Sequence, residues 1–292
     1  PFIVPVPGSK LAGVTGSRDL DDVDTMLAAA GRAGHAVVIG GGLLGLEAAN
    51  GLLRRGMAVT VVHLTDSLMN QQLDPQAALL LKAALERRGL RILLGAQTES
   101  IAGSEKVEAV RFADGLEVPA DLVVMAAGVR PNIALAREAG LYCERAIVVD
   151  DTLQTYDPRV YAVGECAQHR KATFGLVAPI WSQARVCAAH LAGCGHRRYV
   201  QQATATKLKV TGIDLYSAGD IVGLEGSEDL VLRDRHAGVY KRLVLAGNRV
   251  TGAVLYGDVA DGPWYFDLIQ SGADIGAIRD RLLFGPAMCE AA

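Results

Sequence analysis

The feature that most constrains this chain is a glycine-rich turn between an apolar run and an amphipathic stretch. Residues 36–40 read AVVIG, residues 40–45 read GGGLLG, and the amphipathic stretch continues to residue 56. A second apolar run, AVTVVHL, follows at residues 58–64. A strand, a helix and a second strand in this order form a βαβ unit, which implies a parallel sheet covered on both faces. The spacing therefore predicts an α/β fold.

The turn is a G-x-G-x-x-G pattern made by Gly40, Gly42 and Gly45, with Leu43 and Leu44 where the helix begins. The first glycine permits a tight turn, the second lets a pyrophosphate approach the backbone, and the third lets helix and strand pack closely. The N-terminus of the helix favours an anion. The pattern predicts a dinucleotide site, and the alternative is a glycine turn that binds no ligand.

The end of the second strand bears on which nucleotide the turn accepts. An acidic residue commonly binds the adenosine ribose about 20 residues past the glycines, but this chain has His63 there, with Asp66 close by. His63 is compatible with a ribose contact and equally with a side chain that caps the sheet edge. No Lys or Arg between residues 58 and 81 could bind a 2′-phosphate, so Asp66 favours NADH over NADPH.

Composition excludes several other classes of protein. The 292 residues suggest roughly two domains, and 29 basic against 32 acidic side chains leave no polyanion-binding signature, so no nucleic-acid partner is expected. No apolar run is long enough to span a membrane. The five cysteines are odd in number and scattered, which favours a reducing cytoplasm over a disulfide framework. The histidines form no metal-binding cluster.

The rest of the chain alternates between helical and β-type patterns. Beyond residue 198 the pattern is mainly β, with Gly247-Asn248 as a hairpin turn and two helices at the end. The other predicted elements are helices over 17–31, 74–89 and 179–193, strands at 91–95, 121–128, 146–149 and 160–163, and a hairpin over 107–118.

Taken together, the motifs resemble those of the flavin-dependent pyridine nucleotide oxidoreductases. GGGLLGLEAA resembles the NAD fingerprint of this family, DLVVMAAGVRPN its return strand to the flavin domain, and TYDPRVYAVGECA its second flavin motif. Four further stretches are similar to the flavoprotein part of NAD(P)H-dependent nitrite reductase large subunits, with the electron-transfer subunit of assimilatory nitrate reductase as a close sibling. These stretches are LRRGMAVTVVHL, SLMNQQLD, FGLVAPIWSQA and TATKLKVTGIDLYSAGD.

The resemblance implies a flavoprotein fold with two dinucleotide-binding domains and a C-terminal α+β domain. Residues 1–15 would be the crossover from the N-terminal part of the FAD domain, and residues 16–145 the NAD-binding domain. Residues 146–198 would be the remainder of the FAD domain, and residues 199–292 the C-terminal domain. The first flavin fingerprint is expected to precede Pro1.

The resemblance also implies the NAD(H) contacts. Gly40, Gly42 and Gly45 would hold the pyrophosphate of NADH, Glu47 would lie near the nicotinamide, and Gly128 would line the same cleft.

For FAD, the implied residues come from two later motifs. Gly164 and Glu165 would hold the ribityl and pyrophosphate region, and Pro179 and Trp181 would border the isoalloxazine ring. The implied reaction is hydride transfer from NADH to FAD, followed by electron transfer to iron-sulfur or sirohaem-bearing domains or subunits that reduce nitrite to ammonia in nitrate assimilation. The cofactors carry this chemistry, so no catalytic acid or base is expected. A homodimer is also possible.

Two other interpretations stay open at this point. One is a different reductase of the same fold, acting on rubredoxin, ferredoxin or a disulfide. The other is a non-catalytic nucleotide-binding module that lacks FAD.

Overall fold

The computed structural model describes residues 1–32, 34–210 and 212–289. The chain divides into two compact units, one formed by residues 1–128 together with 205–292 and the other by residues 129–204. The four-segment division expected from the sequence, with boundaries after residues 15, 145 and 198, stays a prediction.

A five-stranded sheet forms the centre of the first unit, with β2 (His35–Ile39) in the middle. Every pairing in it is parallel, and the strand order is β1-β8-β2-β3-β4. From β2 the chain winds to β3 and β4 on one side and later reaches β8 on the other, so the order reverses beside β2. The predicted βαβ unit and parallel sheet are confirmed. The remaining strands are β1 (Val14–Thr15), β3 (Ala58–Val62), β4 (Arg91–Leu93) and β8 (Leu122–Met125).

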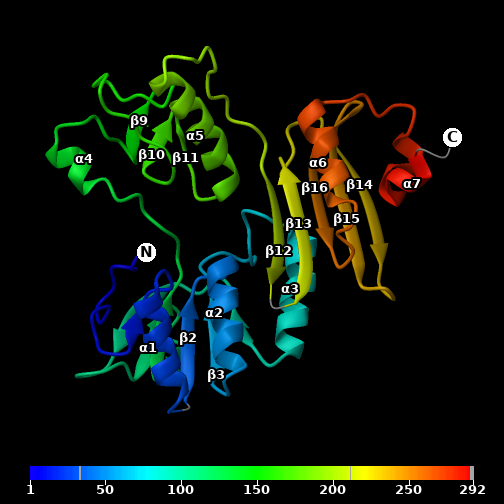
Figure 1. The fold of residues 1–292 in the computed structure, drawn as a ribbon. Helices are drawn as coiled ribbons and strands as arrows, with labels where there is room; N and C mark the ends of the chain where they lie inside the picture. The colour runs from blue at the N-terminus through cyan, green and yellow to red at the C-terminus, as the bar shows by residue number, and fades with distance from the viewer. Residues whose placement is uncertain (33, 211, 290–292) are drawn as a thin grey trace. The chain divides into compact units, whose positions relative to one another are not determined.

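Three helices cover one face of this sheet: α1 (Leu20–Ala30), α2 (Leu43–Leu53) and α3 (Pro75–Arg87). Figure 1 shows α1 and α2 side by side over β2 and β3. Asp19 starts α1 with a capping box, and Asp74 caps α3 ahead of Pro75, which supplies no N–H that would need a partner. These local signals explain why the helices begin at these residues.

The other face of the sheet is covered by a three-stranded antiparallel sheet of β5 (Thr98–Ala102), β6 (Ala109–Phe112) and β7 (Glu117–Pro119). Successive side chains of a strand point to opposite faces. Ala36 and Val38 of β2 therefore join the core under the helices, while Val37 and Ile39 join the core under this small sheet. The hairpin expected over residues 107–118 is confirmed as β6 and β7, and β5 is an additional strand.

The apolar spacing of helix α1 marks its buried face only in part. Leu20, Val23, Leu27 and Ala30 recur at helical intervals, but of these four Ala30 alone is buried and the other three are exposed. The buried positions are Met26, Ala29 and Ala30, which pack in the core shared with α2 and the sheet. The buried face of α1 is therefore rotated away from Leu20, Val23 and Leu27.

The C-terminal part of the first unit is an antiparallel sheet in the order β12-β13-β16-β15-β14. One face packs on α6 (Gly262–Ser271), the 3₁₀ helix Arg279–Phe284 and their neighbours, and side chains on the other face join the core that contains α3. The hairpin at Gly247-Asn248 joins β15 and β16 as expected. The strands are β12 (Ala205–Val210), β13 (Ile213–Gly219), β14 (Glu228–Asp234), β15 (Val239–Ala246) and β16 (Arg249–Tyr256), and α7 (Pro286–Cys289) follows.

The second unit is smaller. Its sheet has the order β11-β10-β9, and α5 (Val177–Leu191) packs against it through Val186 and Cys187. The other elements are α4 (Ala134–Glu138), β9 (Ile147–Val149), β10 (Ala167–His169) and β11 (Ala172–Thr173).

The strand predicted over residues 160–163 is wrong. Only Tyr161 pairs there, in an isolated bridge with Gln154, and the Val163 side chain is 36% exposed. A strand requires a neighbour that accepts and donates hydrogen bonds along its length. Residues 153–155 pair with residues 160–162 at this one bridge, where the N–H of Thr155 donates to the carbonyl of Val160 and the N–H of Ala162 donates to the carbonyl of Leu153, and the pairing does not extend into a strand.

Candidate functional site

The turn between β2 and α2 is tight because two of its glycines pack against backbone. Gly40 has a φ of +130°, and a Cβ at this position would lie 2.2 Å from the carbonyl oxygen of Ala126, just past β8. A Cβ on Gly45 would lie 1.9 Å from the carbonyl oxygen of Gly40. Both positions therefore exclude a side chain. Because Gly40 and Gly45 have no side chains, the turn, helix α2 and strand β8 can pack closely.

Gly42 has a different environment. Its backbone is extended (φ −84°, ψ −179°), and no atom lies within 4 Å of the position that a Cβ would take. Gly42 is the N-cap of α2, and no side chain caps this helix. The N–H groups of the first turn have no intrahelical partners, and the helix dipole adds positive potential there. An anion could therefore approach the backbone at Gly42 without displacing a side chain.

The other candidate residues on α2 differ in burial. Leu44 is 44% exposed and Glu47 is exposed, whereas Leu43 packs partly into the core beneath the helix.

Gly128 belongs to the same edge of the sheet as the glycine turn. Strands β2, β3 and β8 are parallel, so their carboxyl ends meet at one edge, and the strand order reverses there. Such a reversal is where open α/β sheets bind ligands. Gly128 follows β8 with a φ of +115° and open space around its Cβ position, and its carbonyl accepts a hydrogen bond of 2.9 Å from the N–H of Phe2.

His63 lies directly against the glycine turn. The N–H of Gly41 donates to Nδ1 of His63 at 3.1 Å. Burial lowers the pKa of His63, and this effect outweighs the opposing effect of Asn70. The ring is therefore neutral at neutral pH. Asp66 is exposed in the following loop and makes no ion pair with a described residue.

Gly41 is a site residue that the G-x-G-x-x-G pattern does not single out. A Cβ there would lie 2.6 Å from Cδ2 of Leu68 and 2.8 Å from Cγ of His63. The extra glycine between Gly40 and Gly42, at the x position of the pattern, is the sequence signal for this contact.

The flavin candidates all lie in the second unit. Gly164 has a φ of +92°, and its N–H donates to Oε1 of Gln183 at 2.8 Å. Gln183 is buried in α5, and its Nε2 has no hydrogen-bond partner among the described residues. This bond holds the loop of Gly164 and the half-buried Glu165 beside α5. Pro179 is half-buried and Trp181 is 64% exposed in the same helix.

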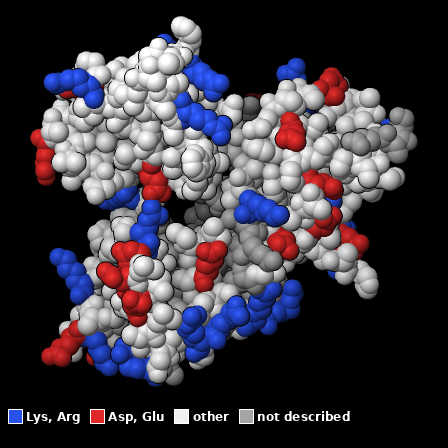
Figure 2. Space-filling view, viewed as in Figure 1, with Lys and Arg blue, Asp and Glu red and all other residues white. Residues whose placement is uncertain are grey.

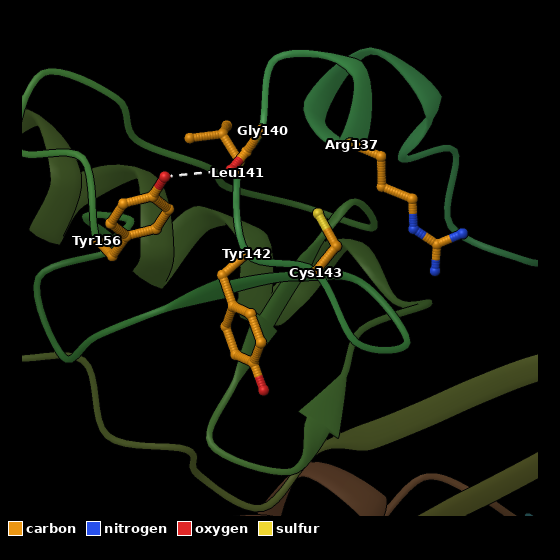
Figure 3. Close-up of a pocket in the computed structure, with 6 residues that line it drawn as sticks. All are labelled: Arg137, Gly140, Leu141, Tyr142, Cys143 and Tyr156. Atoms are coloured by element: carbon orange, nitrogen blue, oxygen red, sulfur yellow. Dashed lines mark hydrogen bonds between the residues drawn. The ribbon is translucent and has the colours of Figure 1, made fainter.

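A separate surface pocket of about 530 Å³ lies in the second unit (Figure 3). The hydroxyl of Tyr156 donates to the carbonyl of Gly140 at 3.1 Å beside it. None of the expected site residues contributes to this pocket. Its lining residues are Arg137, Gly140, Leu141, Tyr142, Cys143 and Tyr156.

No metal-binding group is found among the described histidines, cysteines and acidic residues. Cys143, Cys166, Cys187 and Cys194 are free thiols. Burial raises the pKa of the Cys166 and Cys187 thiols, which disfavours reactive thiolates. In the described part of the chain, no helix is both long and apolar enough to cross a membrane. Figure 2 shows that the face drawn carries both basic and acidic side chains.

Two protein families match different parts of the chain. Residues 1–190 match the family described as pyridine nucleotide-disulphide oxidoreductase, and residues 205–273 match the rubredoxin NAD+ reductase C-terminal domain.

Two bacterial relatives extend this comparison. The nitrite reductase [NAD(P)H] of Bacillus subtilis (strain 168) is 48% identical over 291 residues, which is 100% of this chain and 36% of the relative. The assimilatory nitrate reductase electron transfer subunit of the same organism is 42% identical, covering 97% of this chain and 37% of the relative. The chain thus spans about a third of the length of either relative.

A solved structure gives the same result for the fold. A ferredoxin reductase from Rhodopseudomonas palustris matches with a TM-score of 0.80 at 27% identity, covering 89% of this chain and 65% of that one. The predicted flavoprotein-reductase fold is confirmed by this likeness.

Proposed function

The chain belongs to the pyridine nucleotide-disulphide oxidoreductase family, and on that premise we propose that it is the NADH-binding portion of a flavoprotein reductase. The observation that carries this proposal is the open backbone at Gly42, at the uncapped start of α2, between two closely packed glycines. The 48% identity across the whole chain favours the nitrite reductase branch. FAD is the proposed hydride acceptor, and downstream iron-sulfur or sirohaem-bearing domains are the proposed destination of the electrons.

The residues of the first unit fit the pyrophosphate of NADH. Gly42 leaves space for it, and the unpaired N–H groups of α2 supply donors and positive potential. We place the nicotinamide toward Glu47 and Gly128, at the edge where the strand order reverses. Bound NADH supplies the hydride, and the protein binds and orients it. No acid or base of this chain is required for that task.

The described residues do not complete a site for FAD, which is a second dinucleotide. The sequence contains one G-x-G-x-x-G turn, and that turn is assigned to NADH. The second unit offers one side of a flavin site, through Gly164, Glu165, Pro179 and Trp181. We therefore assign NADH binding to this chain and derive no step through the flavin from its residues.

A second candidate function is reduction of a small electron carrier. It is favoured by the match of residues 205–273 to the rubredoxin NAD+ reductase C-terminal domain and by the 42% identity to an electron transfer subunit. A panel of acceptors distinguishes the two candidates, because a carrier reductase passes electrons from NADH to rubredoxin or ferredoxin without any nitrite-reducing partner.

We also propose a cytoplasmic location. It is supported by the odd number and wide scatter of the cysteines in the sequence, which is unlike a disulfide framework. A homodimer stays a prediction.

The NADH site is tested by Gly42→Val. A Cβ at this position meets no atom within 4 Å, so we expect the fold to tolerate the substitution, but the added side chain occupies the space where the pyrophosphate approaches. We expect calorimetry at pH 7.5 to show loss of NADH binding while far-UV circular dichroism stays unchanged. Unchanged affinity would refute the site.

Gly51→Ala is the matched control, because Gly51 lies in the same helix, also has open space at its Cβ position, and is remote from the turn in sequence. This variant should bind NADH like the wild type and be slightly more stable, since Ala favours a helix interior over Gly by about 1 kcal/mol.

A further inference from the structure

His63 directly follows the carboxyl end of β3 and contacts the glycine turn. Its N–H donates to the carbonyl of Leu93 at 2.8 Å, and its carbonyl accepts from the N–H of Ala96 at 3.0 Å. The side chain reaches the turn, where Nδ1 accepts from the N–H of Gly41 at 3.1 Å. Backbone and ring are therefore both fixed.

The bond to Gly41 determines the protonation state of the ring. A backbone N–H can only donate, so Nδ1 must carry a lone pair and the ring proton must be on Nε2. The Nε2 atom is itself buried and has no hydrogen-bond partner among the described residues. A second proton could be placed only on Nδ1, where it would face the N–H of Gly41. Two donors cannot bond to each other, so protonation of His63 breaks this contact.

The surroundings of His63 contain little negative charge that could stabilise the protonated ring. The segments in contact with it are the turn at residues 40–42, the loop at 64–73 and residues 93–96. Asp66 is the only ionisable side chain in these segments, and it is exposed. The pKa of His63 is lowered by burial, against a smaller effect of Asn70. The ring therefore takes up its proton below about pH 6.5, the usual value for histidine.

We propose that His63 is a positioning residue for the nucleotide-binding turn, whose neutral ring holds Gly41 in place and whose protonation releases the turn and weakens nucleotide binding. This inference rests on the proposed NADH site and adds a regulatory property to it. It also assigns His63 a role other than a ribose contact, because its Nδ1 is occupied by Gly41 and its Nε2 is buried.

Protonation of His63 could also have the opposite effect on nucleotide binding. An imidazolium close to a pyrophosphate would attract it, and this attraction would strengthen binding at low pH. The contact geometry favours the first outcome, because Nδ1 is directed at a backbone donor. The sign of the pH dependence therefore separates a ring that holds the turn from a ring that binds the phosphate.

The test is the dissociation constant of NAD+, which tolerates acid better than NADH, measured by calorimetry at pH 7.5 and pH 5.0. In the wild type we expect affinity to fall about three- to tenfold at pH 5.0, the loss that one hydrogen bond accounts for. His63→Asn should bind equally well at both pH values, because its Oδ1 can accept from Gly41 and does not titrate. His63→Leu should bind about three- to tenfold more weakly at both.

His35→Gln is the matched control. Nε2 of His35 bonds to Oγ1 of Thr60 at 2.8 Å, at the opposite end of β2, and Gln preserves this contact without titrating. This variant should keep the pH dependence of the wild type. Far-UV circular dichroism at both pH values checks that each variant is folded.

Several results would overturn the inference: a flat profile in the wild type, tighter binding at pH 5.0, or a His63→Asn variant that keeps the wild-type slope. None of these three results would refute the proposed nucleotide site itself. Absence of NAD+ binding in the folded wild type at pH 7.5 would instead refute the proposed function together with the inference.

Discussion

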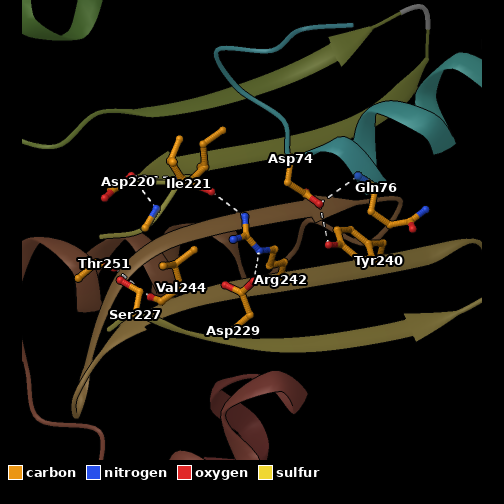
Figure 4. Close-up of polar contacts among 12 residues, drawn as sticks. Asp74, Gln76, Asp220, Ile221, Ser227, Asp229, Tyr240, Arg242, Val244 and Thr251 are labelled. Atoms are coloured by element: carbon orange, nitrogen blue, oxygen red, sulfur yellow. Dashed lines mark hydrogen bonds and ion pairs between the residues drawn. The ribbon is translucent and has the colours of Figure 1, made fainter. Parts of the chain in front are cut away.

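The contact between Tyr240 and Asp74 allows a quantitative test of how the C-terminal sheet is attached to the nucleotide-binding domain. The hydroxyl of Tyr240, on β15, donates to Oδ2 of Asp74 at 2.9 Å, and the N–H of Gln76 donates to the same oxygen at 3.2 Å (Figure 4). Tyr240 is 2% exposed and Asp74 is 7% exposed. The bond therefore joins the start of α3 to a strand that is 166 residues away in the sequence.

The expected loss in the free energy of unfolding follows from the burial of Tyr240 and from the charge of the Asp74 carboxylate. Tyr240→Phe removes the hydroxyl and leaves the ring, so no cavity term is added. Burial raises the pKa of Tyr240, so its hydroxyl remains a donor throughout the working pH range. Oδ1 of Asp74 already has no partner among the described residues, so the variant leaves this carboxylate with the Gln76 N–H alone. A hydrogen bond to a charged group is worth about 1.5–3 kcal/mol, which is the expected loss in the free energy of unfolding.

The assay is urea unfolding of the wild type, Tyr240→Phe, Asp74→Asn and the double variant. A double-mutant cycle isolates the pairwise energy, which we expect to be at least about 1 kcal/mol. In a thermal scan, the loss corresponds to a midpoint lower by about 3–12 °C for a unit of this size.

Tyr216→Phe is the control, because Tyr216 is 5% exposed in the same sheet but its hydroxyl makes no hydrogen bond to a described residue. It should change the free energy of unfolding by less than about 0.5 kcal/mol. A Tyr240→Phe variant as stable as this control, or a pairwise energy near zero, would refute the view that this bond secures the sheet to α3.

Three further predictions concern the cofactors. Asp66 is exposed in the loop after β3, and no Lys or Arg lies between residues 58 and 81, so the chain should prefer NADH to NADPH. Asp66→Arg should shift the ratio of dissociation constants toward NADPH, with Asp66→Asn as the neutral control. Equal dissociation constants for the two nucleotides in the wild type would contradict this prediction. The purified chain should carry no stoichiometric FAD, since it has a single dinucleotide turn, and a yellow preparation with one FAD per chain would disprove that. It should also contain no stoichiometric iron and produce no ammonia from nitrite alone, because its cysteines lack the close spacing of common iron-sulfur clusters; metal analysis and an ammonia assay check this.

Much of the first unit could be predicted from sequence, because its signals are local. Apolar runs of strand length, the GGG turn and the caps at Asp19 and Asp74 act within a few residues of themselves, so β2, α2, β3 and α3 are found where the patterns place them. The glycine turn is readable as a pattern, and the Cβ of Gly45 is excluded by a neighbour close in the chain, the carbonyl of Gly40. The Cβ of Gly40 is excluded by Ala126, which is distant in sequence, so that contact is known only from the fold.

What only the tertiary structure decided depends on partners that are distant in sequence. Residues 160–163 look like a strand but pair with residues 153–155 at a single bridge only. The apolar spacing of α1 likewise does not reveal that Leu20, Val23 and Leu27 lie outside the core. His63 could be interpreted as a ribose contact or a sheet cap until the fold placed its ring 3.1 Å from the N–H of Gly41. A side chain's periodicity is a property of its own segment, whereas its hydrogen-bond partner and its burial are set by segments that reach it only when the chain folds.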